Sequence, residues 1–600
     1  MIADFYPSRV QRFAEEEKLC ERQNNRYSWL RLLIIVAAIS GGMILYSVSV
    51  YWSTAWFFAG LLGFAIVLKK HLTNIENQQQ RERLKIINQQ EQNCLEGDFS
   101  AYPSGAQYEN AKHDYTADLD IFGDYSLFRY LNRTTSPSGS DMLADWLSKP
   151  APTTEIKARQ QAVKELADMI ELRQEMQAIG LKHKELHREL PEFIEWLHSE
   201  PELSDKRKLL RTMQILPCIT LLTILFSVLG WIPSVVVWLP VIVHLMLYGS
   251  VAKKVNFLHQ KVSHKVEFVS AYSELIALIT GTKFSSPCLI SICDCWGEND
   301  ALVLREVQAL QQIRALQNRI RKLDFRLNMA YIPMNILFFY DYGHLVWLER
   351  WRANAGQKVP GWFNALAKVE ALSSFANLLH NYPSWAMPEI CDEYFTLEAK
   401  NMGHPLIPER ERICNDFSLS GAGKIAIITG SNMSGKSTFE RSVGVNMTLA
   451  LAGAPVCASK FAVTNSRLYT YMRIADHLEE QTSSFYAELK RLKQLIDIAK
   501  DGQNVFFLLD EVLRGTNSRD RRIGSMALVR QLARQKVSGI IATHDLALGE
   551  LEHELPAQIS NAHFDVQING EDMSFDYKLY TGICTSLNAT ILMKKIGIEV

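Results

Sequence analysis

Two long stretches of the chain contain no charged residue. One runs from Leu32 to Leu68 and the other from Thr212 to Ala252. A membrane-spanning helix needs about 20 apolar residues, so each stretch is too long for one span and suits two spans joined by a tight turn. We expect the first to turn near residues 50–54 and the second near 230–234, where Pro233 breaks the helix. The pattern predicts four transmembrane helices in two hairpins.

Basic residues flank both stretches, and a hairpin places both of its flanks on the same side of the membrane. The positive-inside rule makes that side the cytosol. We therefore expect an integral protein of the cytoplasmic membrane whose remaining parts are cytosolic. The alternative is that the apolar helices are buried in a water-soluble core. The flanking residues are Arg22, Arg26, Arg31, Lys69 and Lys70 for the first stretch, and Lys206, Arg207, Lys208, Arg211, Lys253 and Lys254 for the second.

Between and beyond these stretches the pattern is helical. Residues 155–211 and 253–330 show helical periodicity and predict two arms that flank the second hairpin. Residues 69–95 are polar with sparse Leu and Ile, which predicts an exposed helix leaving the membrane. A third apolar segment, 329–347, is short and is interrupted by Asp341 and His344. We expect that segment to be buried core.

After about residue 400 the pattern changes to short β-rich runs that end in polar residues, with helical patterns between them. The runs "KIAIITG", "NVFFLLDE" and "VSGIIATHD" are examples. Such alternation predicts helices packed around a mostly parallel sheet.

Composition adds little to this picture. The length of 600 residues predicts two to four domains. The net charge of -1 shows no basic excess that would favour a nucleic-acid partner. Ten cysteines are scattered along the chain, and three of them form the cluster Cys288, Cys293 and Cys295. Because their spacing fits no zinc pattern, we expect structural thiols rather than a metal site.

The stretch from Gly430 to Ser437 matches the phosphate-binding pattern G-x-x-x-x-G-K-[ST]. Its glycines let backbone N–H groups face phosphate oxygens, and the following helix adds partial positive charge. We expect Lys436 to reach the β- and γ-phosphates and Ser437 to ligate Mg²⁺. The predicted nucleotide-binding residues are Gly430, Ser431, Asn432, Met433, Ser434, Gly435, Lys436, Ser437 and Thr438.

Two acidic residues end the apolar run "VFFLLDE". We expect Asp510 to hold Mg²⁺ through water, and Glu511 to act as the general base for the attacking water. The run "GIIATHD" ends near His544, where a γ-phosphate sensor would lie. These residues predict a Mg²⁺-dependent ATPase that forms ADP and phosphate, with Glu511, Lys436 and His544 as catalytic residues.

The segments "TGSNMSGKST", "LLDEVLRGTNS" and "ATHD", in this order, resemble the ATPase domain of the MutS family of DNA mismatch repair ATPases. The segment "MRIADHLEEQTSSFYAEL" lies between the first two and resembles the signature segment of that family. The resemblance implies ATP bound between two ATPase domains of a homodimer. It also implies that Ser483 reaches the γ-phosphate of the partner subunit as a further catalytic residue.

The resemblance extends upstream, and so do departures from it. Residues 119–150 resemble the start of the MutS core and lever domain, which makes the helical arms similar to levers. A membrane hairpin stands where the family has its mismatch-reading domain. The second hairpin stands where the family inserts its DNA clamp. The position that stacks on adenine in the family falls near Arg412–Ile413 and is not aromatic, so adenine specificity does not follow.

We therefore expect a multidomain fold in which an α/β phosphate-loop (ABC-like) ATPase domain joins an all-α core and lever domain and four transmembrane helices. Three parts are predicted. Residues 1–95 contain a hairpin at about 30–68 and a polar helix. Residues 96–399 form a MutS-like helical domain, interrupted by a hairpin at about 212–252. Residues 400–600 form the MutS-like ATPase domain.

The predicted function is that of a membrane-anchored ATPase of MutS type, in which ATP binding and hydrolysis move the levers. Its expected partners are a second copy of the chain and the lipid bilayer, with DNA implied by the resemblance alone and no protein partner specified. One alternative is a tethered DNA-binding repair or recombination factor. Another is an ABC-type transporter ATPase, but "LSGAG" precedes the phosphate loop, which is the wrong order for that class.

Overall fold

The computed structural model describes residues 4–183, 190–199, 207–263, 266–297, 308–323, 331–392, 395–431, 433–472, 484–569 and 572–584. The protein is multidomain and mostly helical, with mixed sheets. It divides into two compact units. Unit 1 consists of residues 1–133, 140–170 and 371–600, and unit 2 consists of residues 134–139 and 171–370.

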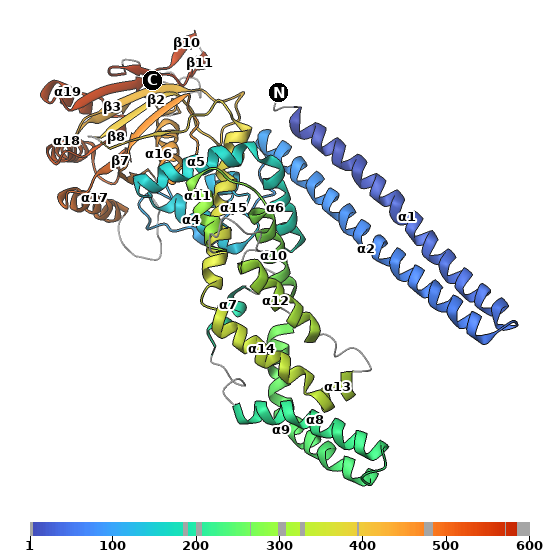
Figure 1. Ribbon diagram of the computed structural model, residues 1–600. Helices are drawn as coiled ribbons and strands as arrows, with labels where there is room; N and C mark the ends of the chain where they lie inside the picture. The colour runs from blue at the N-terminus through green and yellow to red at the C-terminus, as the bar shows by residue number, and fades with distance from the viewer. Residues whose placement is uncertain are drawn as a thin grey trace. The chain divides into compact units, whose positions relative to one another are not determined.

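Unit 1 begins with a long helical hairpin, α1 (Phe5–Tyr46) and α2 (Val50–Leu95), whose helices lie side by side (Figure 1). In its tip, large apolar side chains point outward, and Leu33, Met43 and Trp52 are 62%, 71% and 67% exposed. Small residues face inward instead. A Cβ added at Gly60 would lie 2.5 Å from the Cβ of Ala38. The tip therefore has close helix packing and hardly any apolar core of its own.

The base of the hairpin is packed differently, with polar side chains between the helices. Asn74 donates hydrogen bonds to the Cys20 carbonyl at 2.8 Å and to the Asn24 side chain at 2.7 Å. Arg31 contacts His71 at 3.0 Å. The prediction of an exposed helix over 69–95 was therefore only half right. This segment continues α2 without a break, and one face of it is buried against neighbouring parts of unit 1.

A buried ion pair ties α2 to the rest of unit 1. Glu91 pairs with Arg133, whose Nη2 lies 3.1 Å from Oε2 of Glu91. The side chain of Asn377 donates to the same oxygen at 3.0 Å. Burial would raise the pKa of Glu91, but the Arg133 guanidinium and these hydrogen bonds hold that pKa below its ordinary value.

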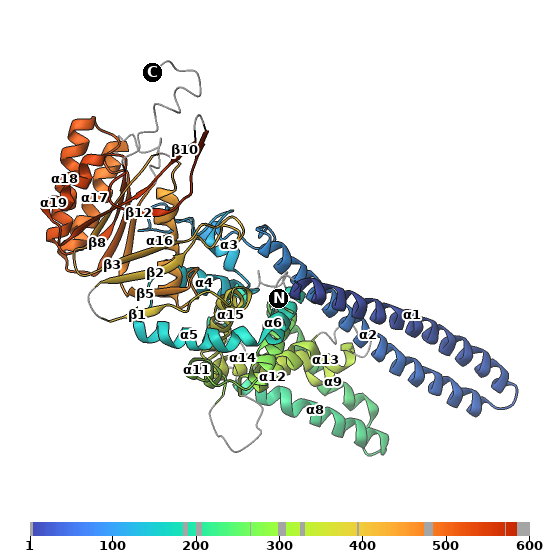
Figure 2. The same ribbon diagram turned by 90° about the horizontal axis from the view of Figure 1, so that it is seen from above.

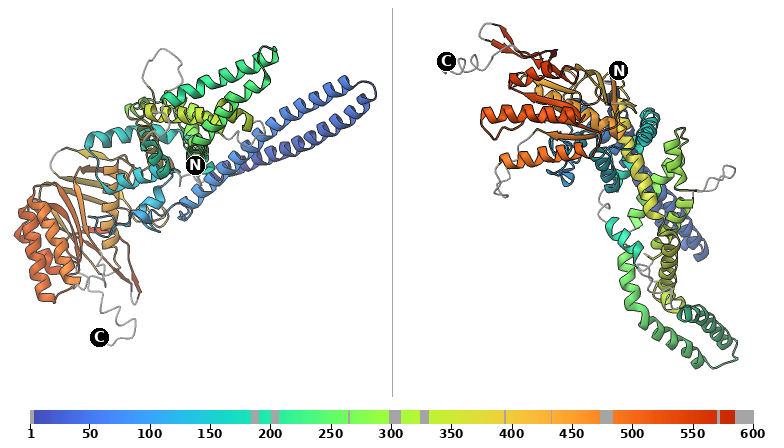
Figure 3. Two further views of the ribbon diagram at one scale, coloured as in Figure 1. Left: turned by 90° about the horizontal axis from the view of Figure 1, so that it is seen from below. Right: turned by 90° about the vertical axis from the view of Figure 1, so that its left-hand side faces the viewer.

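Unit 2 is helical and contains a second apolar hairpin, α8 (Arg207–Val228) and α9 (Trp238–Ser263), joined through the 3-10 turn η3 (Ser234–Val237) (Figure 3). The segment near residues 331–347 is split by Phe339, which has a φ of 49°. Asp341 and His344 on its second half are buried, as expected of core. The other helices are α6 (Ile170–Lys182), α7 (Leu190–His198), α10 (Val266–Thr280), α11 (Pro287–Asp294), α12 (Gln308–Leu323), α13 (Tyr331–Phe338), α14 (Tyr340–Ala355) and α15 (Val359–Asn381), of which α15 belongs to unit 1 from residue 371 on.

Within the described residues, 3 helices are long and apolar enough to cross a membrane: α1, α2 and residues 211–228 of α8. Residues 234–250 form a shorter apolar helical segment. The 3 long apolar helices thus occur in the two predicted hairpins, whereas a second shorter apolar helix, Val269–Thr280, lies outside them. The number of four spans stays a prediction.

The C-terminal part of unit 1 is built on two sheets. One has the order β1-β5-β2-β3 and the other the order β12-β9-β4-β8-β7-β6. In the six-stranded sheet, β9, β4, β8, β7 and β6 are parallel and β12 is antiparallel. The strands are β1 (Glu389–Cys391), β2 (Thr396–Met402), β3 (Asn415–Ser420), β4 (Ile425–Thr429), β5 (Lys460–Thr464), β6 (Arg467–Tyr471), β7 (Val505–Asp510), β8 (Ser538–Thr543), β9 (Ile559–Phe564) and β12 (Leu579–Thr581), with a separate β10 (Gln567–Asn569) and β11 (Asp572–Ser574) ribbon.

Helices cover both faces of the six-stranded sheet (Figure 2). On one face Leu495 and Leu532 pack with Phe507. On the other, Gly444 lies close to Leu508. Because both faces are covered, the central strands are apolar along their whole length, and the polar residues that follow them gather at one edge. The covering helices are α16 (Lys436–Ala452), α17 (Ser484–Lys500) and α18 (Ser518–Arg534), and unit 1 also holds α3 (Leu127–Leu131), α4 (Pro137–Ser148), α5 (Thr153–Asp168), η1 (Ala106–Tyr108), η6 (Leu546–Glu550) and α19 (Leu551–Glu554).

Candidate functional site

The loop between β4 and α16 has the backbone that a phosphate-binding loop requires. Gly430 and Gly435 have φ values of 153° and 107°, in the region that favours glycine. A Cβ added at Gly430 would lie 2.9 Å from the Phe564 carbonyl oxygen, so a larger residue does not fit there. Met433 also has a positive φ, of 68°. The loop thus curls ahead of the α16 N-terminus, where backbone N–H groups are unpaired in any helix.

The predicted lysine is buried within this loop. Nζ of Lys436 donates to the carbonyl oxygens of Gly430 at 2.9 Å and Ser431 at 2.7 Å. Burial lowers the pKa of Lys436, and the nearby carboxylates of Asp510 and Glu511 partly offset this effect. The ammonium group is therefore held at the loop by two neutral acceptors, which a phosphate oxygen can replace.

Ser437 and Asp510 come together as predicted. The Ser437 hydroxyl donates to Oδ2 of Asp510 at 2.6 Å. The other carboxylate oxygen of Asp510 is buried and has no hydrogen-bond partner among the described residues. A buried carboxylate oxygen beside a hydroxyl is the kind of hard donor set that Mg²⁺ prefers. The residues present therefore fit this ion, together with oxygens of a nucleotide and water.

Glu511 follows Asp510 and has a φ of 47°. Its carboxylate contacts Nε2 of His544 and lies 2.5 Å from Nε of Arg514. Nδ1 of His544 in turn lies 2.8 Å from the Gly430 carbonyl oxygen. Burial would raise the pKa of Glu511, but His544, Arg514 and Lys436 bring that pKa below its ordinary value of 4.5. The carboxylate is ionised near neutral pH and is engaged on both oxygens.

Two further residues at this edge were missed from the sequence. Glu440 on α16 is buried and accepts a hydrogen bond from the Ala542 N–H of β8 at 3.0 Å. Burial and the nearby Asp510 raise the pKa of Glu440 well above its ordinary value. The ring of Tyr577 would lie 3.1 Å from a Cβ added at Gly435, and this residue is 44% exposed. The sequence offered two signals for these residues. One is the acidic residue in the helix after the phosphate loop, and the other is an aromatic residue late in the chain.

The other predicted positions have different outcomes. Asn432 and Ser483 lie outside the described residues. Arg412 is occupied by structural contacts, because its guanidinium donates to the Ile407 carbonyl at 2.6 Å and lies 5.3 Å from the Trp385 ring centroid. Arg412 therefore does not take the place of the aromatic residue that stacks on adenine in the family.

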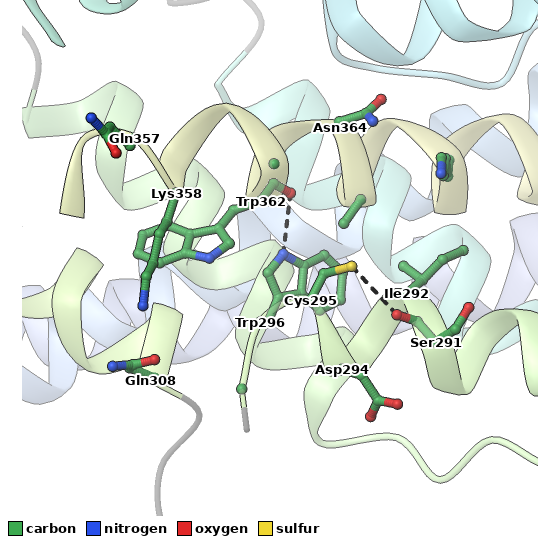
Figure 4. Close-up of a pocket in the computed structure, with 14 residues that line it drawn as sticks. Ser291, Ile292, Asp294, Cys295, Trp296, Gln308, Gln357, Lys358, Trp362 and Asn364 are labelled. Carbon is green, nitrogen blue, oxygen red and sulfur yellow. Dashed lines mark hydrogen bonds between the residues drawn. The ribbon is translucent and has the colours of Figure 1, made fainter. Parts of the chain in front are cut away.

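One member of the cysteine cluster, Cys295, lines a separate cavity of about 500 Å³ in unit 2 (Figure 4). The Cys295 thiol donates to the Ser291 carbonyl at 3.4 Å, and the Trp296 indole donates to the Trp362 carbonyl at 3.1 Å. Burial raises the pKa of Cys293 to about 11. Among the described residues, no group of at least 3 His, Cys, Asp or Glu side chains is arranged to hold a metal ion.

Comparison with known proteins gives two family matches. Residues 426–596 match MutS domain V, and residues 109–225 match MutS domain III. The first match contains the phosphate loop, Asp510, Glu511 and His544. The protein is thus of the multidomain class that carries MutS domains. Two regions of the chain are thus similar to domains of the MutS family.

Similar proteins carry the same family name. The chain is 31% identical over 238 residues to the DNA mismatch repair protein MutS of Thermotoga maritima, which covers 39% of this chain and 29% of that protein. It is 30% identical over 236 residues to the DNA mismatch repair protein MutS of Persephonella marina, covering 38% of this chain and 26% of that protein. The DNA mismatch repair protein MutS 2 of Halobacterium salinarum is 29% identical over 269 residues, covering 43% and 30%. The matches thus span less than a third of these relatives.

Proposed function

We propose that this protein is a membrane-anchored ATPase of MutS type. The observation that carries the proposal is the convergence of Lys436, Ser437, Asp510, Glu511 and His544 on one loop at the edge of a parallel sheet. The family matches support it, because the match to MutS domain V includes all five residues. The site would take ATP with Mg²⁺ and release ADP and phosphate.

Each side chain has a defined task in this proposal. Lys436 would leave the carbonyls of Gly430 and Ser431 to bind phosphate oxygens. Ser437 and Asp510 would hold Mg²⁺, which supplies charge neutralisation at the phosphates. Glu511 would accept the proton of the attacking water. Since both of its oxygens are engaged by His544 and Arg514, one of these contacts must loosen first.

We also propose that Tyr577 stacks on the nucleotide base. Its ring lies beside Gly435, close to the N-terminus of α16 where the phosphates would bind. An exposed aromatic face in this place suits any base, so it supports nucleotide binding without selecting adenine. The Tyr577→Ala variant should weaken nucleotide binding, whereas Tyr577→Phe should retain it. Equal affinity of the alanine variant and the wild type would contradict this role.

The chemistry is tested by two substitutions in the purified full chain. Lys436→Ala should abolish nucleotide binding, because it removes the cation of the loop. Glu511→Gln should leave ATP bound but slow its turnover about 100-fold or more, the usual scale of general-base catalysis. Lys490→Ala, an exposed position on α17, serves as the control. Normal hydrolysis by the Glu511→Gln variant would show that another group is the base.

The tip of the α1–α2 hairpin supports the membrane anchor. Its outward apolar side chains and inward small residues are the packing expected of helices in lipid. From Trp29 to Tyr46, α1 rises about 26 Å at 1.5 Å per residue, close to the thickness of a bilayer core. Arg22, Arg26 and Lys70 are exposed at the basal end of this span. They suit a cytosolic membrane surface.

Deleting residues 32–68 tests the anchor. The intact protein should stay in the membrane fraction after washing with alkaline carbonate. The deletion should reduce this retention, and it should abolish it when residues 212–252 are also removed. Full retention of the double deletion would overturn the proposal of an anchor, while leaving the ATPase proposal intact.

A tethered DNA-binding repair factor is the second candidate. It is favoured by the relatives, whose names describe DNA mismatch repair proteins. A homodimer that shares ATP through Ser483 belongs to both proposals. Binding of matched and mismatched duplex DNA at low and high salt decides between them, since contacts to phosphate weaken as salt rises. Absence of binding at low salt would remove the DNA candidate.

A further inference from the structure

Helix α17 packs directly on the loop that carries the proposed general base. That loop runs from Glu511 to Gly515, after β7. A Cβ added at Gly515 would lie 2.8 Å from the Cβ of Phe485 and 3.1 Å from its Cα, so only glycine allows the loop this close to the helix. One turn further along α17, Glu488 is buried against the same loop. The contact therefore involves both the backbone and a charged side chain.

The carboxylate of Glu488 holds this loop through its backbone. It accepts a hydrogen bond from the N–H of Leu513, and the N–H groups of Arg514 and Gly515 also bond to it. Three adjacent N–H groups thus converge on one side chain. Burial raises the pKa of Glu488, while these hydrogen bonds and Arg514 act in the opposite direction. The acceptor of these bonds thus belongs to α17, and not to β7 or the phosphate loop.

The loop needs such support because its backbone is strained. Glu511 and Leu513 have φ values of 47° and 62°, and Leu513 is a bulky residue in a region that favours glycine. Residues in this region persist only where the surrounding structure determines them. The loop also places Arg514 against Glu511 at 2.5 Å. A small change in the backbone at Leu513 would therefore change the direction of the Glu511 side chain and its ion pair with Arg514.

We propose that Glu488 is the positioning residue of the general base, and that it couples the place of α17 to the direction of Glu511. This inference rests on the proposed ATPase function. Glu488 does not touch nucleotide in this arrangement and acts through the 511–515 loop. A displacement of α17 would carry the three N–H groups with it and shift Glu511 relative to His544 and Arg514.

The sequence shows what could displace α17. The helix begins at Ser484, inside the segment that resembles the MutS signature, and Glu488 follows Ser483 by five positions. If Ser483 engages the nucleotide of a partner subunit, Glu488 links that event to the catalytic loop through hydrogen bonds. Such a displacement of α17 would change the direction of the Glu511 carboxylate, and it would leave the affinity for ATP unchanged.

A purely structural role for Glu488 predicts a different set of effects. Loss of a buried side chain that only supports folding would lower stability, nucleotide affinity and turnover together. A positioning role predicts that turnover falls while nucleotide affinity is kept. The amide of glutamine keeps an oxygen acceptor, so Glu488→Gln should restore much of the turnover that Glu488→Ala loses.

The experiment measures kcat, KM and nucleotide affinity for the full chain in detergent, using ATP and a fluorescent ATP analogue. We expect Glu488→Ala to lower kcat by about tenfold or more, which corresponds to losing one or two hydrogen bonds at the transition state, with affinity changed less than about twofold. Glu488→Gln should lie within about threefold of the wild type. Lys493→Ala, on the exposed face of α17, should match the wild type.

Several outcomes would overturn the inference. A wild-type kcat in Glu488→Ala would do so, and so would a parallel loss of affinity and kcat in a folded variant. If Glu488→Ala does not fold, Glu488→Asp decides, because the shorter side chain should reach the loop poorly and lower kcat. A wild-type kcat in the aspartate variant would then overturn it. If the wild type itself hydrolyses no ATP, the proposed function fails first, and the two failures are distinguishable.

Discussion

Individual residues of unit 1 are held in unusual protonation or backbone states by their neighbours. Glu440 is a buried carboxyl with a raised pKa, whereas Glu511, a short distance away along the sheet edge, has a lowered one. Burial and the nearby Asp510 raise the pKa of Glu440, whereas the contacts of Glu511 with His544 and Arg514 outweigh the effect of its burial. Two carboxyl groups at one sheet edge can therefore carry different charges at the same pH.

A pH effect is expected from His404, next to the first sheet. Burial lowers the pKa of His404 to about 4 from an ordinary value of 6.5, and Arg441 and Arg412 add to the shift. The unfolded chain therefore binds more protons than the folded protein between these values. The free energy of unfolding should be unaffected by this group above pH 6.5 and should fall as the pH drops toward 4.

The measurement is the denaturant midpoint of unit 1 at pH 7 and pH 4.5. Asparagine can still accept the hydrogen bond that the Leu406 N–H donates to His404 at 3.3 Å, so His404→Asn should reduce the pH dependence without removing that contact. An unchanged pH dependence in this variant would show that other groups cause it.

Glu91 gives a stability prediction at the same scale. Glu91→Ala would leave the Arg133 guanidinium buried without its carboxylate, which typically costs about 3–5 kcal/mol. The free energy of unfolding, measured by chemical denaturation, should fall by an amount of this order. Glu17→Ala, which removes a partly exposed partner of Lys85, should cost less than about 1 kcal/mol. Similar losses for the two variants would contradict the special role of the buried pair.

At the scale of elements, the α1–α2 hairpin combines two kinds of packing in one pair of helices. The tip relies on small residues such as Gly41 and Gly60, and the base relies on a ladder of polar side chains that includes Asn24 and Asn74. Each kind suits a different surrounding. Close backbone contact is favoured in lipid, and buried polar pairs give register near water.

Gly60→Leu should separate the helices at the tip. Its Cβ would lie 2.5 Å from the Cβ of Ala38, so the helices must move apart or unwind locally. Gly63→Ala is the matched control, because its nearest neighbour would lie 4.0 Å away. Thermal unfolding in detergent should show a lower midpoint for the leucine variant and an unchanged one for the control. Equal midpoints would mean that the tip is not closely packed.

The elements themselves were largely predictable from the sequence. Long uncharged runs identified the hairpins, and β-rich runs ending in "TG", "DE" and "THD" identified strands of the parallel sheet. The sequence placed Glu511 and His544 near the ends of two such runs, and the structure adds the contact between them. Tyr577, Glu440 and Glu488 were not predicted, because they reach the site through tertiary packing and the sequence signals for them were weak. Helical periodicity also could not show that one face of residues 69–95 is buried.

At the scale of the whole molecule, the proposed membrane topology has a directional consequence. Both hairpins would place their turns on the face of the membrane opposite to the sheets. Ser49→Cys, at the first turn, should react with an impermeant maleimide added outside intact cells, above the background of the native cysteines. Lys149→Cys, at an exposed position of unit 1, should react only after lysis. Labelling of both, or of neither, before lysis would exclude this topology.

The attachment of the α1–α2 hairpin to the rest of unit 1, through Glu91 and Arg133, affects how two copies would meet. Proteins that share a bilayer diffuse in two dimensions with restricted tilt, so their local concentration far exceeds that in the surrounding volume. A weak association between subunits would then suffice for pairing. The density of the protein in the lipid sheet, rather than its total amount in the cell, would set how often a paired state forms.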